Sequence, residues 1–181
     1  MTTMARRTRI FARLLKSSET NIEEVEDLSA HRAKRAKLQR SLIGRWIFGR
    51  LDDEATAEEI EVAGLRTLVH RPRAGVSPLP CVINFHGGGW VQGNPEQSQW
   101  LASSLAAKNR CVVVSPAYRL APEHPFPAGV NDARSVVEWV VEHADELGID
   151  PQRIAVMGDS AGGNLAAVTA LDARDSDGRT A

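Results

Sequence analysis

The sequence predicts an α/β fold in which helices flank a mainly parallel β-sheet. Three apolar runs of strand length, Cys81–Phe85, Cys111–Ser115 and Ile154–Met157, are separated by segments of helical character. The runs show no alternation of apolar and polar residues, which is typical of strands covered on both faces. Strands that alternate with helices favour parallel strands joined by crossovers. The chain of 181 residues, 43% hydrophobic and 25% charged, suffices for one domain of ordinary size.

The segments before the first apolar run carry weaker signals. Residues 1–50 are expected to be helical, and residues 52–59 to be an acidic connector. The region from Ile60 to His70 predicts a hairpin around Ala63-Gly64, and a proline-rich loop follows it. One apolar stripe of helical spacing supports the first expectation: Leu38, Leu42, Ile43, Trp46 and Ile47.

The segments between and after the apolar runs complete the predicted pattern. Trp100–Ala107 is expected to form a short helix, and residues 116–128 a rigid proline-rich loop. Val130–Leu147 predicts an amphipathic helix, and Ala161–Leu171 another helix, followed by a frayed end from Asp172 onward. Four valines of the amphipathic helix are expected to face inward: Val136, Val137, Val140 and Val141.

The charge pattern argues against a nucleic-acid partner. Residues 1–50 hold 12 Lys and Arg against 5 Asp and Glu, a balance that would suit a basic arm for nucleic acid or anionic lipid. No interleaved aromatic residues or nucleic-acid motif accompany these charges, which favours a solvated helical face.

Cysteine usage and hydropathy exclude further classes. Cys81 and Cys111 each open an apolar run, as small buried residues do in a reducing compartment, and no Cys/His cluster suggests a metal. There is no apolar stretch of secretory-signal or membrane-spanning length, so we expect a cytoplasmic protein without a membrane span.

Two motifs carry the chemistry. His86-Gly87-Gly88-Gly89-Trp90 follows the first apolar run, and consecutive glycines let backbone amides face an oxyanion. Taken alone, it is equally consistent with a tight turn. Gly158-Asp159-Ser160-Ala161-Gly162 follows the third run and fits the G-x-S-x-G elbow, whose strained turn exposes a nucleophilic serine. Its alternative is an ordinary serine that caps a helix.

A third motif joins the second apolar run to the amphipathic helix. It runs from Tyr118 to Ala128, and its prolines predict a rigid path across the top of the sheet. Glu123 and His124 within it suggest an acid/base pair, but they precede Ser160 on a loop that looks structural, which favours hydrogen bonding within the loop.

Together, the residues from about Gly64 to Ala170 resemble the hormone-sensitive-lipase-like family of α/β-hydrolase esterases. The resemblance implies an eight-stranded, mostly parallel sheet with helical cap segments over an ester pocket, and no cofactor. It implies Ser160 as the nucleophile. It assigns oxyanion-hole amides to three residues, Gly87, Gly88 and Ala161, and support of that loop to His86 and Gly89, without a role for His86 as the base. Residues 1–50 then correspond to the helical cap segment and 51–181 to a partial α/β-hydrolase domain acting on short- or medium-chain acyl esters.

All five histidines precede Ser160, whereas this family places its acid and histidine after the nucleophile. Asp172, Asp175 and Asp177 follow it too soon to be the acid. We therefore expect an N-terminal portion of an esterase that stops before the acid, the base and the last strands. A catalytically inactive remnant, a ligand-binding module of the same fold and completion in trans by a second chain remain open. Such a truncation would leave Ile154–Met157 as a bare sheet edge, prone to self-association or to pairing with a complementing chain.

Overall fold

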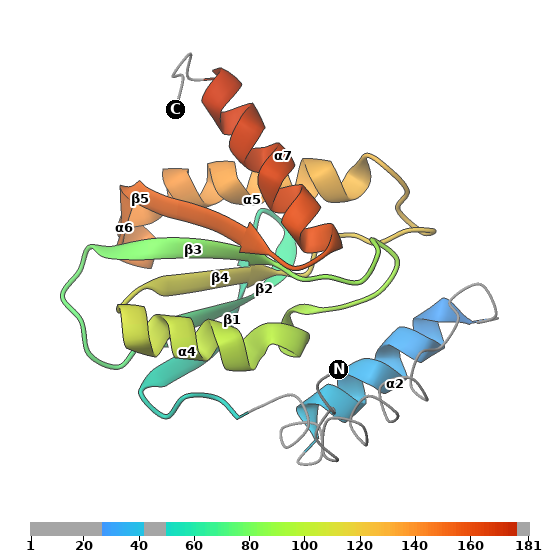
Figure 1. Ribbon diagram of the computed structural model, residues 1–181, viewed down its shortest axis with the longest axis horizontal. Coiled ribbons are helices and arrows are strands. Elements are labelled where there is room, and N and C mark those ends of the chain that lie inside the picture. Colours follow the sequence, from blue (N-terminus) through green and yellow to red (C-terminus); the bar gives the residue numbers. More distant parts are fainter. Residues whose placement is uncertain (1–26, 42–49, 177–181) are drawn as a thin grey trace, which may run out of the picture. The chain divides into compact units, whose positions relative to one another are not determined.

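A computed structural model describes residues 27–41 and 50–176 (Figure 1). The chain divides into two units, Met1–Arg35 and Ala36–Ala181. Helix α2 spans Leu28–Arg40, within the segment predicted to be helical. The carboxylate of Asp27 accepts a hydrogen bond from the amide of Ala30 at 2.9 Å, as an N-cap residue does. Most of the predicted apolar stripe, from Leu42 to Ile47, lies outside the described residues.

The second unit is built on a five-stranded sheet of order β1-β2-β4-β3-β5. Its strands are β1 (Ala55–Val62), β2 (Leu65–Pro72), β3 (Leu79–Phe85), β4 (Val112–Pro116) and β5 (Ile149–Gly158). Strand β3 pairs in parallel with both β4 and β5, whereas β2 pairs antiparallel with β1 and β4. The three apolar runs are therefore the parallel part of the sheet, as predicted, and the antiparallel hairpin extends it on the β4 side.

The hairpin forms where it was predicted, but its first strand begins earlier than expected. Ala63 and Gly64 have φ values of 51° and 76°, and two left-handed residues are what a two-residue hairpin turn requires. The predicted acidic connector is wrong, because β1 starts at Ala55. Strand β1 is the outer strand of the sheet, so most of its side chains stay in water and no apolar alternation marks it. Glu58 pairs with Arg71 across the hairpin at 2.8 Å.

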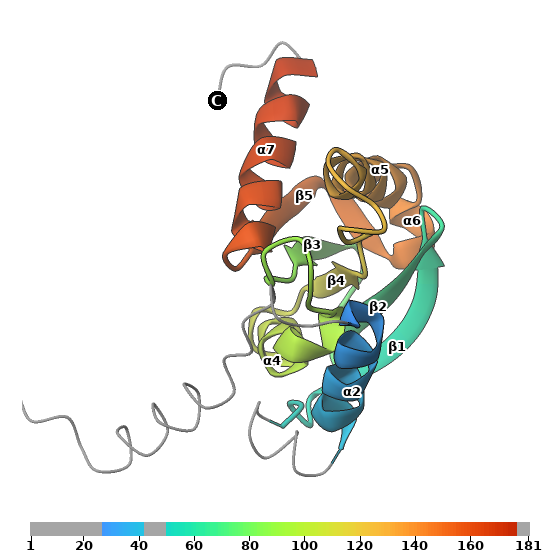
Figure 2. The ribbon, with the colours of Figure 1, turned by 90° about the vertical axis from the view of Figure 1, so that its right-hand side faces the viewer.

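Helices cover both faces of the sheet (Figures 1 and 2). Helix α4 (Gln99–Asn109), which follows the short 3₁₀ helix η2 (Pro95–Ser98), lies on one face. Helices α5 (Ala128–Glu142) and α7 (Ala161–Ser176) lie on the other. None of the described helices combines the length and the apolar character that crossing a bilayer demands.

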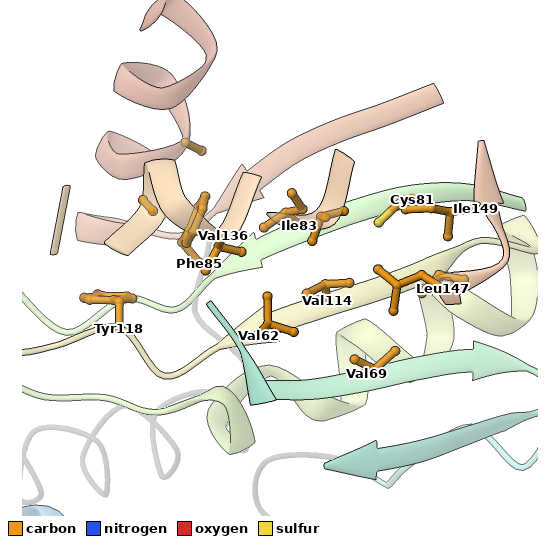
Figure 3. Close-up of a cluster of buried hydrophobic side chains, with 14 of the residues drawn as sticks. Val62, Val69, Cys81, Ile83, Phe85, Val114, Tyr118, Val136, Leu147 and Ile149 are labelled. Carbon is orange, nitrogen blue, oxygen red and sulfur yellow. The ribbon is translucent and has the colours of Figure 1, made fainter. Parts of the chain in front are cut away.

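The side chains of β4 show how two cores arise from one sheet. Val112 and Val114 join the larger core beneath α5 and α7, whereas Val113 joins a smaller core beneath α4. Figure 3 shows part of the larger core, where Phe85 at the end of β3 lies near Val136 of α5. Both side chains are fully buried. This packing fixes the end of β3, from which the glycine loop departs.

Helix α5 differs from the prediction at its C-terminal end. Val136 and Val140 are buried as expected, but Val141 is 45% exposed. The helix ends at Glu142, and His143 separates it from the short helix α6 (Ala144–Leu147). The ring of His143 stacks on Trp139 at a centroid distance of 3.9 Å, and the local backbone turns there, so the apolar face does not continue in one line.

The C-terminal elements contain one correction and one confirmation. Helix α7 continues to Ser176, so the expectation of a frayed end is wrong for residues 172–176, whereas residues 177–181 lie outside the described residues. Asp172 pairs with Arg134 of α5 at 2.6 Å. Strand β5 stands at the end of the sheet order, as expected for the strand with the bare edge. In the part of the chain that the structure describes, β3 is its only pairing partner.

Candidate functional site

The turn between β5 and α7 places Ser160 in a strained backbone conformation. Ser160 has a φ of 52°, in the left-handed region that residues with a β-carbon rarely adopt, and it is exposed. The turn also packs tightly against the end of β3. A β-carbon on Gly162 would lie 2.0 Å from the carbonyl oxygen of Phe85, and one on Gly158 would lie 2.3 Å from the carbonyl carbon of Gly162. The glycines of the motif are therefore sterically required, as in a nucleophile elbow.

The glycine loop starts beside this turn because β3 and β5 are neighbours. Phe85 and Gly158, the last residues of the two parallel strands, lie opposite each other in the register. The loop turns sharply after β3, since Gly88 and Gly89 have φ values of 133° and 62°. A β-carbon on Gly88 would lie 2.0 Å from the carbonyl oxygen of Gln92. The structure thus brings the two predicted motifs together at the carboxyl ends of adjacent strands, where open α/β sheets bind ligands.

The amide of Gly87 is already engaged. It donates a hydrogen bond to Oδ1 of Asp159 at 2.9 Å, and its carbonyl accepts one from the side chain of Gln97 at 3.1 Å. A β-carbon on Gly87 would lie 2.2 Å from Oδ2 of Asp159, so this glycine is needed for the contact. The predicted oxyanion role for Gly87 therefore conflicts with the bond that its amide makes here. Sequence reasoning missed Asp159, although it occupies the variable second position of the elbow motif.

The amides of Gly88 and Ala161, the other two predicted oxyanion-hole donors, are free to bind an anion. Within the described ranges, no acceptor takes a hydrogen bond from the amide of Gly88 or of Ala161. Ala161 is the first residue of α7, a helix of 16 residues. The first amides of a helix have no partner inside it and carry the positive end of its dipole. These two amides are available for a developing negative charge.

His86 lies beneath the loop as a neutral, buried side chain. Its ring stacks on Tyr118 with a centroid distance of 4.2 Å, and its Nδ1 donates to the carbonyl of Gly87 at 3.0 Å. Burial is the largest influence on its pKa and lowers it to about 4. A side chain that is 1% exposed and neutral suits support of the loop.

An ion pair anchors the loop after β4 to helix α5. Arg119 donates to Asp132 on α5 from both its side chain, at 2.6 Å, and its amide, at 2.7 Å. The same loop reaches the glycine loop through the amide of Ala121, which donates to the carbonyl of Trp90 at 2.9 Å. Glu123 and His124 are exposed on it. All five histidines of the chain are described, and none forms a hydrogen bond with Ser160.

The remaining reactive side chains offer no metal centre. Among the described residues, no three His, Cys, Asp or Glu side chains are grouped as a metal site would require. Cys81 and Cys111 are free and buried, and burial raises the pKa of Cys81 to about 12, so its thiol stays protonated.

Comparisons with known proteins identify the fold family of the chain. The profile of the alpha/beta hydrolase fold matches residues 82–180. The carboxylesterase NlhH of Mycobacterium tuberculosis is 54% identical over 97 residues, which cover 54% of this chain and 30% of that protein. An arylesterase of Saccharolobus solfataricus is 47% identical over 94 residues, covering 52% of this chain and 31% of the arylesterase.

A solved structure is similar over a greater length. The hyperthermophilic esterase of the archaeon Pyrobaculum calidifontis superposes with a TM-score of 0.81 at 38% identity, covering 97% of this chain and 56% of that one. The chain thus spans just over half of this esterase, and its matched part spans about a third of the two curated relatives.

Proposed function

Because the chain belongs to the hormone-sensitive-lipase-like esterases of the α/β-hydrolase fold, we propose that it carries the nucleophile and the oxyanion site of a carboxylic-ester hydrolase. The observation that carries the proposal is the left-handed conformation of Ser160 between β5 and α7. Glycine would adopt this backbone conformation without strain. The presence of an exposed serine there is therefore explained by its side chain and not by the fold. Small acyl esters are the proposed substrates, because the similar proteins include a carboxylesterase and an arylesterase.

The chemistry follows from the groups around Ser160. Its Oγ attacks the acyl carbon, the carbonyl oxygen becomes an oxyanion, and the amides of Gly88 and Ala161 donate hydrogen bonds to it. The alcohol then leaves with a proton, and water hydrolyses the acyl-serine ester. We assign Gly87 to holding the loop, since its amide is bound to Asp159, and Gly89 to the turn that follows.

The attack needs a base that removes the proton of Ser160. Because no histidine of this chain is bonded to Ser160, we propose that the base and its acid partner come from outside residues 1–181. We propose that the segment carrying the base and the acid pairs with the edge of β5, either as a continuation of this chain or as a second chain. Residues 1–50 are proposed to form the helical cap segment of the substrate pocket, and residues 51–181 to form the partial hydrolase domain.

The absence of a hydrogen bond between Ser160 and any histidine of this chain favours a second candidate function. A site with an exposed serine and free amides, but no base, would bind an ester or carboxylate without hydrolysing it. The chain would then be a ligand-binding module of the same fold or an inactive remnant. Ligand binding that Ser160→Ala leaves unchanged, together with no covalent labelling of Ser160, would favour this candidate.

Covalent labelling tests the proposal independently of turnover. The chain is incubated with a large excess of a fluorophosphonate, and the modified residue is located by mass spectrometry of peptides. The proposal expects slow modification at Ser160, favoured by the oxyanion amides without the base, and none at position 160 in Ser160→Ala. The exposed Ser135 of α5 serves as an internal control. Equal modification of Ser135 and Ser160 would show that Ser160 has no special reactivity and would overturn the proposal.

A further inference from the structure

The peptide group between His86 and Gly87 is held at both ends. The hydroxyl of Tyr118 donates to the carbonyl oxygen of His86 at 2.7 Å, and the amide of Gly87 donates to Oδ1 of Asp159 at 2.9 Å. The carbonyl and the amide belong to one planar peptide unit and point in opposite directions. One rigid group is therefore gripped from two sides.

The two gripping residues come from the strands on either side of β3. Tyr118 follows the end of β4 at Pro116, and Asp159 follows the end of β5 at Gly158. In the sheet order, β3 lies between these strands. The loop that leaves β3 is thus anchored to both neighbours at its first peptide, ahead of the rotatable backbone bonds of Gly87.

Fixing this peptide determines where the following amide points. Once the plane of the His86–Gly87 peptide is set, only two backbone angles of Gly87 separate it from the amide of Gly88. Glycine has wide conformational freedom, so an unanchored loop would sample several directions. The next peptide is held as well, because the carbonyl of Gly87 accepts bonds from the side chain of Gln97 and from Nδ1 of His86. The two residues therefore fix the first of two consecutive peptide units. Burial keeps the hydroxyl of Tyr118 a hydrogen-bond donor: Tyr118 is 3% exposed, and burial, with the charge of Asp159 as a smaller influence, raises the pKa of the hydroxyl.

We propose that Tyr118 and Asp159 are positioning residues that lock the His86–Gly87 peptide and thereby direct the amide of Gly88 toward the oxyanion. Neither residue touches the substrate. The inference rests on the proposed function for the role of Gly88, but the lock itself is a property of the loop and is measurable without any esterase activity.

The test measures the amides of Gly87 and Gly88 by ¹H–¹⁵N NMR in the full 181-residue chain. Tyr118→Phe removes the hydroxyl and keeps the ring on His86. Asp159→Ala removes the acceptor, and Asp159→Asn keeps an oxygen in its place. Thr169→Val is the matched control, because it removes another buried hydroxyl, which donates to Leu165 within α7 at 2.6 Å and has no bond to the loop.

The lock predicts a specific pattern. Tyr118→Phe and Asp159→Ala should each raise the hydrogen-exchange rate of the Gly87 amide about tenfold, the loss expected for one such bond, and shift the resonance of Gly88. Asp159→Asn should restore most of the protection. Thr169→Val, compared at equal global stability, should leave both amides unchanged. Combining Tyr118→Phe with Asp159→Ala should add less than the two separate effects, since they act on one peptide.

Two results would overturn the lock. One is a Gly88 resonance and a Gly87 exchange rate in Tyr118→Phe that match those of Thr169→Val. The other is Asp159→Asn behaving like Asp159→Ala in both measurements. If the amides respond as expected while Ser160 resists fluorophosphonate, the lock holds and the proposed function fails, so the two failures are distinct.

Discussion

Gly162 packs so closely against Phe85 that a β-carbon on the glycine would lie 2.0 Å from the carbonyl oxygen of Phe85. This contact joins the first turn of α7 to the end of β3 and so fixes the elbow beside the glycine loop. Backbone atoms form both sides of it, and neither side has a flexible side chain that could move away.

Gly162→Ala should therefore destabilise the chain strongly. Overpacking against backbone typically costs about 1–3 kcal/mol, and the contact here is at the severe end. Gly129→Ala is the matched control, since its β-carbon would lie 3.4 Å from the nearest atom and alanine favours the helix α5 in which it stands. Urea unfolding followed by tryptophan fluorescence measures both free energies. A Gly162→Ala variant as stable as Gly129→Ala would contradict the packing described for the elbow.

Acid should weaken the fold through two buried histidines. Burial lowers the pKa of His70 and of His86 to about 4, from an ordinary value of 6.5. The unfolded chain therefore binds protons more readily than the folded one. The contribution of the two histidines to the free energy of unfolding should be completely present above about pH 6.5. It should fall as the pH drops toward 4, by up to about 3 kcal/mol for each histidine.

His70→Leu isolates one of these contributions. Neither ring nitrogen of His70 has a hydrogen-bond partner, so leucine removes a titrating group without breaking a bond. Urea unfolding at pH 7 and pH 4.5 should show a smaller difference for His70→Leu than for the wild type. An identical pH dependence in the two proteins would mean that burial does not lower the pKa of His70.

The edge of β5 should make the isolated chain associate. Strand β5 ends the sheet order, and Ala155 on it is exposed beside partly buried apolar neighbours. Ala155→Lys should reduce association, because a charged side chain blunts an edge, whereas Ala170→Lys, an exposed position on α7, should not. Size-exclusion chromatography with light scattering reports the mass. A wild-type chain that is a monomer and unfolds cooperatively would show that the edge of β5 does not pair with another chain.

Esterase turnover by the chain alone should be small. Removing one member of a catalytic triad leaves only residual acceleration from the oxyanion hole and binding, roughly 10³–10⁴-fold over water. Hydrolysis of p-nitrophenyl butyrate by the chain is compared with that by Ser160→Ala. A large Ser160-dependent rate would show that a histidine of this chain acts as base, and loss of that rate in His124→Ala would identify it.

The parts predicted from the sequence are those with a local signal. Continuous apolar runs mark β3, β4 and β5, and the elbow is marked by glycines that its own crowding requires. Strand β1 lacked such a signal, since an outer strand keeps its side chains in water. The break in α5 at His143 was missed because apolar residues of helical spacing continue past it, at Ala144 and Leu147.

The roles of Asp159 and Tyr118 could not be predicted because they depend on contacts between distant residues. The bond from Gly87 to Asp159 joins residues 72 positions apart, and the bond from Tyr118 to His86 spans 32. The sequence marks the glycines as donors without showing which amide is already engaged. Only the pairing of β3 between β4 and β5 brings these groups together.

A structure of the chain after reaction with an alkyl phosphonate ester would show whether Ser160 and the amides of Gly88 and Ala161 form one site. The phosphonyl group mimics the tetrahedral intermediate on Ser160. We predict phosphorus bonded to Oγ of Ser160, with one phosphonyl oxygen about 2.7–3.1 Å from the amide nitrogens of Gly88 and Ala161 and the amide of Gly87 still bound to Asp159. A phosphonyl oxygen directed away from both amides, or no adduct on Ser160, would contradict it.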